Sequence, residues 1–436
     1  MTTRAGNAPG ARGSGARSPV ALLGTRRLWP LALTQSCGAL NDNLVKNAMV
    51  VLALFQLGSG GTGLSALAGA LFIAPYILLS APAGQLADRF AKSRLIVAYK
   101  LAEVLLMTGA AGAFLTESVP GLLIVLTGLG IQATLFGPVK YGVIPELLQD
   151  RDLVAGNGVI EATTFLAIVA GTVAGGALIL LPRGTVWVSA VGMALALLGL
   201  WSALQIPAAP VADASLRISA NIVAETWRIT RRAASVRPVW LAILGLSWFW
   251  TIGAALITEF PVIARDTLGS DGTVLTLQLT VFAIGVGVGS MQCARLLKGD
   301  VSARIVPFAG IGISVFCWDY ASAAGSAGSL ATWVSAISAI SGWRMVIDLF
   351  LLAACGGVFS VPLYAIIQNR AAPTERARIV AANNIMNALF MVAGAAATAG
   401  AAAIGWEAPR FLHAAAAANL LVALWIMRVV RSRAEA

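Results

Sequence analysis

Charge is scarce in this chain, because charged residues make up 11% of its 436 positions and hydrophobic residues make up 58%. Histidine occurs once, at position 413. The four cysteines show no metal-ligand or disulfide spacing: Cys37, Cys293, Cys317 and Cys355. Neither a zinc site nor a disulfide framework is therefore indicated. We also find no metal cluster, phosphate-binding loop or nucleophile arrangement, so the sequence predicts neither an enzyme nor a cofactor.

Long apolar runs are what the chain has in abundance. A bilayer core about 30 Å thick needs ~20 apolar residues per helix. The sequence supplies this length twelve times and predicts an all-α membrane protein. The predicted spans are 28–57, 65–87, 93–116, 119–147, 155–181, 185–206, 238–263, 273–297, 302–324, 343–369, 376–404 and 408–430.

Lysine and arginine alternate with these spans in a way that sets the orientation. If the first span runs from inside to outside, the inner segments hold 23 of the 30 lysines and arginines. The outer segments hold four, and three lie within spans. Positive charge stays on the cytoplasmic side of a membrane, so both termini are predicted to be cytoplasmic. The net charge of +11 is accordingly attributed to contact with anionic membrane lipids and not with nucleic acid.

The spans divide into two groups of six. Residues 1–27 are predicted to be a disordered basic tail, 28–206 a six-helix bundle, 207–237 a cytoplasmic linker, 238–431 a second six-helix bundle and 432–436 a short tail. The linker alternates apolar residues with Arg and Glu, which is compatible with a surface helix on the inner leaflet or with a plain tether.

The two groups also repeat each other. Three landmarks recur at offsets of 224, 226 and 223 residues: Pro138 and Pro362, Asn157 and Asn383, Gly171 and Gly394. Parallel six-span repeats of this kind are typical of the major facilitator fold.

A loop motif after the second span supports that fold. The segment GQLADRFAKSR at residues 84–94 resembles the loop motif of the major facilitator superfamily, with Ala91 where glycine is usual. Its carboxylate can accept hydrogen bonds from helix-terminal amides or from an arginine of a neighbouring helix, and so latch one conformation. The residues assigned to this latch are Gly84, Asp88, Arg89, Lys92 and Arg94.

Further segments resemble the bacterial lysophospholipid transporter family. They include PVKYG at 138–142, LVAGNGVIEA at 153–162, NDN at 41–43 and VPLY at 361–364. Residues 247–261 are similar to the transporter domain of fused acyltransferase and acyl-carrier synthetase proteins, and we expect neither enzyme domain here. The resemblance implies a flippase of the bacterial inner membrane. It would move lysophosphatidylethanolamine or lysophosphatidylglycerol from the outer to the inner leaflet for reacylation, with a cytoplasmic acyltransferase as a candidate partner.

Polar residues within the spans are the candidates for the substrate path, because ionisable groups are costly in a bilayer and usually line a cavity. The predicted set is Asn41, Asp42, Asn43, Lys140, Tyr141, Glu161 and Tyr364. Simpler roles are open for three of them. Asp42 can pair with Lys46 one turn later, Lys140 can extend to the inner interface, and Glu161 can pair with Lys140.

The seventh span departs from the family. It has Ile257, Thr258 and Glu259 where the family carries a basic residue, which bears on headgroup preference. Lys46 and Glu259 are expected at similar outward depth and can form a gate that holds the inward-open state. The alternative is that Glu259 simply reaches the outer interface.

Two other functions remain open from the sequence. One is a facilitator for another amphiphile or drug, coupled to protons through Asp42 or Glu259. The other is a membrane anchor that binds an acyltransferase without transporting anything. Polar residues within the spans argue against a pure anchor, which has no need of them.

Overall fold

The computed structural model describes residues 17–56, 61–270 and 272–431, and these residues form helices and no strand. Helices satisfy every backbone hydrogen bond within one segment, which is what an apolar chain requires in lipid. Proline stands at the first turn of α2, α5, α9 and α11, where its missing N–H costs nothing.

The first half of the chain contains α1 (Pro19–Leu23), α2 (Trp29–Val51), α3 (Gly61–Arg89), α4 (Lys92–Leu115), α5 (Val119–Leu147), α6 (Leu153–Ile179) and α7 (Gly184–Ala203). A linker with α8 (Ile222–Ser235) follows. The second half contains α9 (Arg237–Val262), α10 (Thr273–Leu297), α11 (Val306–Ser326), α12 (Trp333–Ser338), α13 (Ile340–Arg370), α14 (Arg376–Ala403) and α15 (Ala408–Arg431). Single turns of π-helix follow α2 (Leu52–Gln56) and α9 (Ile263–Thr267), and a 3₁₀ turn (Asp150–Asp152) precedes α6.

Twelve of the helices in the described residues are at least 20 residues long, and each corresponds to one predicted span. Ten of them are long and apolar enough to cross a membrane. The other two are α2 and α11, whose polar residues include Asn41, Asp42, Lys46 and Asp319. A multi-pass membrane protein is thus confirmed, and the count of twelve crossings stays a prediction. The predicted span at 302–324 begins only at Val306, because residues 301–303 are irregular.

The prediction of a disordered tail is wrong for its last part. Ser18 caps α1 by accepting a hydrogen bond from the backbone N–H of Ala21, and Leu22 is fully buried where α1 packs against α6. Residues 1–16 and 432–436 lie outside the described residues. The linker is also more than a tether, because α8 presents Ile229 and Ala233 to the core and leaves Val223 and Trp227 exposed.

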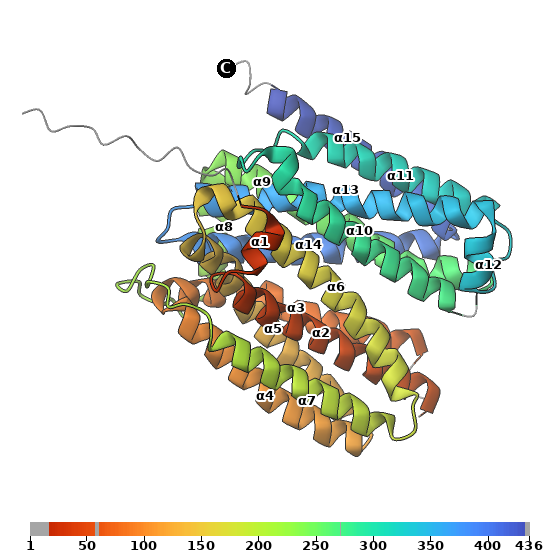
Figure 1. Ribbon diagram of the computed structural model, residues 1–436, viewed down its shortest axis with the longest axis horizontal. Coiled ribbons are helices and arrows are strands. Elements are labelled where there is room, and N and C mark those ends of the chain that lie inside the picture. The colour runs from red at the N-terminus through yellow and green to blue at the C-terminus, as the bar shows by residue number, and fades with distance from the viewer. Residues whose placement is uncertain (1–16, 57–60, 271, 432–436) are drawn as a thin grey trace, which may run out of the picture.

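The helices gather into two bundles (Figure 1). In the first, α2 packs against α6 and α7, and α4 packs against α5 and α7. In the second, α13 packs against α10 and α11, and α15 packs against α11. The bundles meet along two seams, α3 with α14 and α6 with α10.

Glycine permits the close approach at both seams. A Cβ on Gly84 of α3 would lie 2.8 Å from the Cα of Arg378 on α14. A Cβ on Gly158 of α6 would lie 2.4 Å from the carbonyl oxygen of Ser290 on α10. Any larger residue at either position would push the two bundles apart at the end of the molecule where α3 ends and α6 begins.

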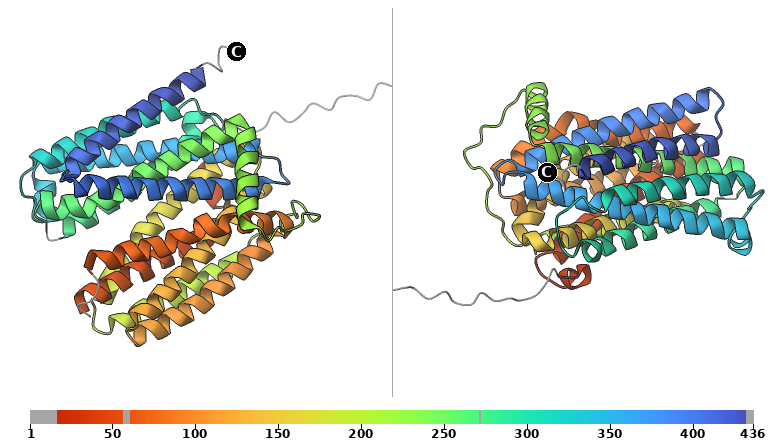
Figure 2. Two further views of the ribbon diagram at one scale, coloured as in Figure 1. Left: turned by 180° about the vertical axis from the view of Figure 1, so that it is seen from behind. Right: turned by 90° about the horizontal axis from the view of Figure 1, so that it is seen from above.

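At the same end of the molecule, the linker contacts both helices of the seam between α3 and α14. Figure 2 shows α8 lying across the ends of the long helices, and it contacts α3, α9 and α14. Arg232 of α8 pairs with Glu375 just before α14 at 3.0 Å, and this carboxylate raises the pKa of the guanidinium. Earlier in the linker, the backbone N–H of Ser219 donates to Gln85 Oε1 at 2.7 Å.

Candidate functional site: a central cavity

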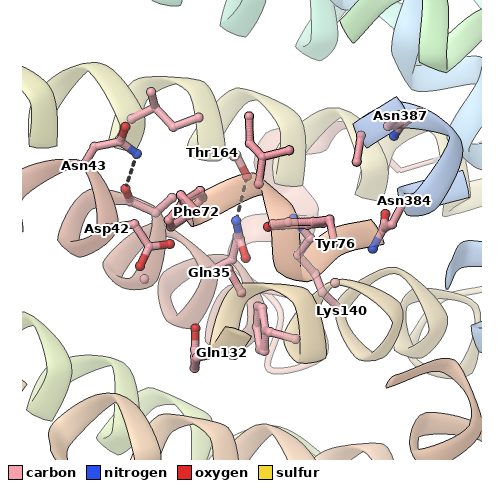
Figure 3. Close-up of a pocket in the computed structure, with 18 of the residues that line it drawn as sticks. Gln35, Asp42, Asn43, Phe72, Tyr76, Gln132, Lys140, Thr164, Asn384 and Asn387 are labelled. Carbon is pink, nitrogen blue, oxygen red and sulfur yellow. Dashed lines mark hydrogen bonds between the residues drawn. The ribbon is translucent and has the colours of Figure 1, made fainter. Parts of the chain in front are cut away.

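A cavity of about 360 Å³ lies between the two bundles (Figure 3). The first bundle supplies the charged side chains that line it: Asp42, Lys46, Lys100, Lys140 and Glu161. The second bundle supplies neutral ones: Trp250, Tyr364, Asn384, Asn387, Ala388 and Met391. Apolar side chains such as Phe72, Ile73 and Ile168 complete the wall. A few polar groups in a mostly apolar cavity are the usual arrangement for a small-molecule site.

The three consecutive polar residues at positions 41–43 of α2 point to two different faces of the helix. Asp42 and Asn43 line the cavity, and Asn43 donates within the helix to the carbonyl of Ala39 at 2.8 Å. Asn41 does not line it, so the prediction for Asn41 is wrong. Its amide donates to the carbonyl of Gly192 on α7 at 3.1 Å, because a neighbouring residue in a helix points about 100° away.

Asp42 lacks the intrahelical partner that the sequence offered. Within the described residues, no ion pair joins it to Lys46, and its buried Oδ1 has no hydrogen-bond partner. A buried carboxylate oxygen without a partner is costly, so such an atom facing a cavity is suited to a ligand that donates hydrogen bonds.

A pair of stacked tyrosines closes the cavity at one end, which we call its floor. Tyr141 of α5 and Tyr364 of α13 stack with their ring centroids 4.4 Å apart and an interplanar angle of 6°. Their positions differ by 223 residues, the same offset as the glycine landmarks. Each bundle contributes one tyrosine to this stack, and within the second bundle Trp250 Nε1 donates to the Tyr364 hydroxyl at 3.1 Å.

Glu161 binds a tyrosine and not the predicted lysine. The Tyr141 hydroxyl donates to Glu161 Oε1 at 2.5 Å, while the buried Glu161 Oε2 has no hydrogen-bond partner in the described part of the chain. Lys140 instead places its Nζ 4.3 Å from the centroid of the Tyr141 ring. Lys140 lines the cavity, is 8% exposed and forms no ion pair within the described residues, so it does not extend to the interface.

The sequence analysis did not identify a buried ion pair next to the cavity, formed by Lys100 and Glu103. Lys100 Nζ lies 2.6 Å from Glu103 Oε2, one turn further along α4, and both side chains are buried. Gln132 and Asn41 each donate to the Glu103 carboxylate at 3.3 Å. The sequence contained a signal for this pair, because two opposite charges three residues apart in an apolar span can pair on one helix face.

Two asparagines of α14 were missed as well. Asn384 and Asn387 line the cavity from the second bundle, and Asn387 Oδ1 accepts a hydrogen bond from Ser247 at 2.9 Å. In the sequence, Asn383, the residue before Asn384, served only as a landmark of the repeat. Asn383 is buried, and its side-chain amide has no hydrogen-bond partner among the residues that the structure describes; it does not line the cavity.

The loop motif lies at the end of the molecule beyond the aromatic floor. Asp88 accepts hydrogen bonds from the backbone N–H groups of Ala377 and Arg378 at 3.0 and 3.2 Å, and from Arg378 Nε at 3.0 Å. Lys92 pairs with Glu146 at 2.5 Å, Arg89 donates to the carbonyl of Leu216 at 2.5 Å, and Arg94 is exposed.

A reciprocal amide pair joins the bundles near the same end. Asn157 of α6 and Gln368 of α13 donate to each other at 2.7 and 2.9 Å. Together with the contacts of Asp88, this pair closes one end of the cavity, because both lie beyond the stacked tyrosines.

The proposed gate is not formed in this structure. Lys46 lines the cavity near the other end of α2, and Glu259 of α9 is buried, yet no ion pair joins them in the part of the chain described. The gate was predicted for the inward-open state, whereas this structure is closed at the end that carries Asp88. The pair therefore stays a prediction.

Comparison with known proteins identifies the superfamily to which this fold belongs. The family model of the Major Facilitator Superfamily matches residues 31–346. Among solved structures, the human organic anion transporter MFSD10 (TETRAN) aligns with a TM-score of 0.72 at 13% identity, over 91% of this chain and 98% of that one. The transporter FucP in the outward conformation aligns with a TM-score of 0.68 at 13% identity, over 92% and 98%. The fold is therefore the all-α transporter fold of this superfamily.

Similar proteins of known name identify the family within this superfamily. The lysophospholipid transporter LplT of Salmonella gallinarum is 30% identical over 315 residues, which is 69% of each chain. The LplT of Pectobacterium carotovorum is 29% identical over 317 residues, which is 69% of this chain and 68% of that one. The chain thus belongs to the lysophospholipid transporter family of the major facilitator superfamily.

Proposed function

We propose that this protein moves lysophospholipids, in particular lysophosphatidylethanolamine, from the outer to the inner leaflet of the bacterial cytoplasmic membrane by alternating access. The observation that carries the proposal is the central cavity, in which unpaired polar groups lie beside an apolar wall. The relatives named as lysophospholipid transporters support the substrate class.

The chemistry of a lysolipid fits this lining. A zwitterionic headgroup carries a phosphate and an ammonium, neither of which crosses hydrocarbon unaided. Lys140 has no ion-pair partner among the described residues and is assigned to the phosphate, and Asp42 is assigned to the ammonium. Phe72, Ile73 and Met391 offer an apolar surface for the single acyl chain. The phosphoglycerol headgroup lacks an ammonium, so Asp42 favours ethanolamine.

The observed contacts also suggest how access alternates. With Asp88 bound to α14 and the tyrosines stacked, the bundles are joined at one end, which we assign to the cytoplasm because the basic loops lie there. Moving the lysolipid inward requires these contacts to break, and the gate between Lys46 and Glu259 is proposed to close the outer end. The lysolipid delivered to the inner leaflet is then available to a cytoplasmic acyltransferase.

The proposal is tested by uptake of labelled lysophosphatidylethanolamine and lysophosphatidylglycerol into proteoliposomes. We expect Lys140→Ala to slow both substrates much more than Lys140→Arg does. Asp42→Asn should slow the ethanolamine lipid more than the glycerol lipid. Arg295→Ala is the control, because Arg295 is exposed and lies outside the cavity lining. No uptake of either lipid by the folded protein would contradict the proposal and leave two functions, a facilitator for another amphiphile and a membrane anchor.

A proton-coupled facilitator is the second candidate, because Glu161 lines the cavity and its buried Oε2 has no hydrogen-bond partner among the described residues. The same assay decides it when a pH gradient is imposed across the liposome membrane. Acceleration by the gradient in wild type, lost in Glu161→Gln, would favour proton coupling. Equal rates with and without the gradient would exclude it.

A further inference from the structure

Residues of the second bundle line a second cavity. The helix ends that carry these residues lie at the end of the molecule opposite α12 (Figure 1). The volume of this cavity is about 380 Å³, close to that of the central cavity. It is formed by the first turns of α9 and α11, the last turns of α13 and α15, and the loop at residues 301–305. These helix ends lie at the same end as the basic loops, which is predicted to be cytoplasmic.

The walls and the rim of this cavity differ in character. The wall is apolar and includes Leu241, Leu363, Ile366 and Ile426. Two arginines also line it, and both are exposed: Arg304 and Arg370. An apolar interior with a cationic rim matches a molecule that has a hydrocarbon tail and an anionic head.

Among the described residues, a single carboxylate lies near the two arginines, so their positive charge exceeds the negative charge around them. Arg304 has one nearby carboxylate, Asp300, at 3.7 Å, and it donates to the carbonyl of Leu297 at 3.1 Å. Arg370 forms no hydrogen bond or ion pair within the part of the chain described. A guanidinium without a partner at the membrane surface is suited to a phosphate, which it can bind through two parallel hydrogen bonds.

The position of the cavity links it to the transport path. Leu363 and Ile366 of α13 line this second cavity, whereas Tyr364 of the same helix lines the central one and forms its floor. The last turns of α13 are therefore the wall between the two cavities. A molecule in the second cavity supports the side of α13 that faces away from the tyrosine stack.

We propose that this cavity binds a phospholipid of the adjacent leaflet with a net negative, phosphatidylglycerol-type headgroup. Its phosphate lies between Arg304 and Arg370, and an acyl chain lies along the apolar wall behind α13. Charge complementarity selects an anionic lipid over a zwitterionic one, because the described residues place two arginines and a single nearby carboxylate at this cavity. Binding here is independent of the substrate proposed above, because none of its residues lines the central cavity.

The test uses the full-length protein in detergent, with thermal unfolding followed by the fluorescence of its 12 tryptophans. Dioleoyl phosphatidylglycerol or dioleoyl phosphatidylcholine is titrated, and the lipid concentration that gives half of the maximal stabilisation is recorded. We expect saturable stabilisation by phosphatidylglycerol at a concentration at least about ten-fold lower than by phosphatidylcholine.

Two variants locate the binding. Arg370→Ala should raise the half-saturating concentration of phosphatidylglycerol about ten-fold or more, as expected for the loss of a hydrogen-bonded charge. Ala303→Trp, which fills the cavity from its loop, should weaken binding by both lipids while leaving the arginines in place. Arg370→Lys should recover part of the selectivity.

Arg428→Ala is the matched control, because Arg428 is exposed near the same end of α15 and does not line the cavity. Its loss should change the half-saturating concentration by less than about five-fold. The proposal is overturned if the two lipids stabilise equally. It is also overturned if Arg428→Ala weakens binding as much as Arg370→Ala does, or if Ala303→Trp binds like wild type.

Discussion

Replacing Asp88 with asparagine should open the end of the molecule that is closed here. The Asp88 carboxylate accepts two backbone N–H groups from the start of α14 and one bond from Arg378 Nε. Asparagine keeps the size of the side chain but loses the charge, and its amide nitrogen faces donors instead of accepting from them. A hydrogen bond to a charged group contributes about 1.5–3 kcal/mol, and leaving a buried donor unpaired costs about 1–3 kcal/mol.

Together these losses weaken the closed end by about 3 kcal/mol relative to the open end, which is a shift of about 100-fold in the equilibrium. The estimate applies to the difference between two folded states, so the variant should still insert and fold. Gly84 lies one turn before Asp88 and keeps the helices close enough for these contacts to form.

The shift can be measured as a distance between spin labels at Phe90 and Ala372, two exposed positions beside the seam. The native cysteines are replaced first. Wild type should give one short distance, and Asp88→Asn should add a longer component that becomes a major population. Asp150→Asn is the control, since Asp150 is exposed near the same end. A folded Asp88→Asn protein with the wild-type distance distribution would refute the latch.

Three further outcomes are expected. Lys100→Met should destabilise the protein by about 3–5 kcal/mol, because it leaves Glu103 buried without its charge partner, and the double variant with Glu103→Gln should recover much of that loss in thermal unfolding. Tyr141→Phe should keep the stacked ring but remove its hydroxyl donor, so uptake should slow while stability changes by about 1 kcal/mol, and an unchanged rate would show that the bond is dispensable. Lys46→Glu or Glu259→Lys alone should impair uptake, and the double reversal should recover part of it. A double reversal no better than the worse single variant, with no crosslink between cysteines at these positions, would exclude the gate.

The helices were predictable because membrane insertion depends on local composition. Each apolar run long enough to cross the bilayer became a helix close to its predicted ends. The short helix α1 was not predictable in the same way. Five residues carry too weak a pattern, and α1 is held by the burial of Leu22 against α6, a contact between distant parts of the sequence.

For the candidate cavity, the sequence allowed a prediction of which ionisable residues line it, but not of their contacts. Asp42, Lys140 and Glu161 line the cavity, as ionisable residues within spans usually do. Which face of a helix meets the cavity depends on how the helices pack, so Asn41 was assigned to the wrong side. Partner choice depends on angstrom-scale geometry, which explains why Glu161 binds Tyr141 and not the adjacent lysine.

Divergence between the two halves explains why the cavity is charged on one side only. Tyr141 and Tyr364 occupy corresponding positions of the repeat and still stack against each other. The residues that precede these tyrosines differ: Lys140 lines the central cavity, whereas Leu363 lines the second cavity. In the proposed function, a headgroup held by Lys140 and Asp42 is therefore bound by the first bundle alone. The second bundle, which offers amides and aromatic rings, is then free to move past the bound lipid when the tyrosine stack separates, without breaking an ion pair to the substrate.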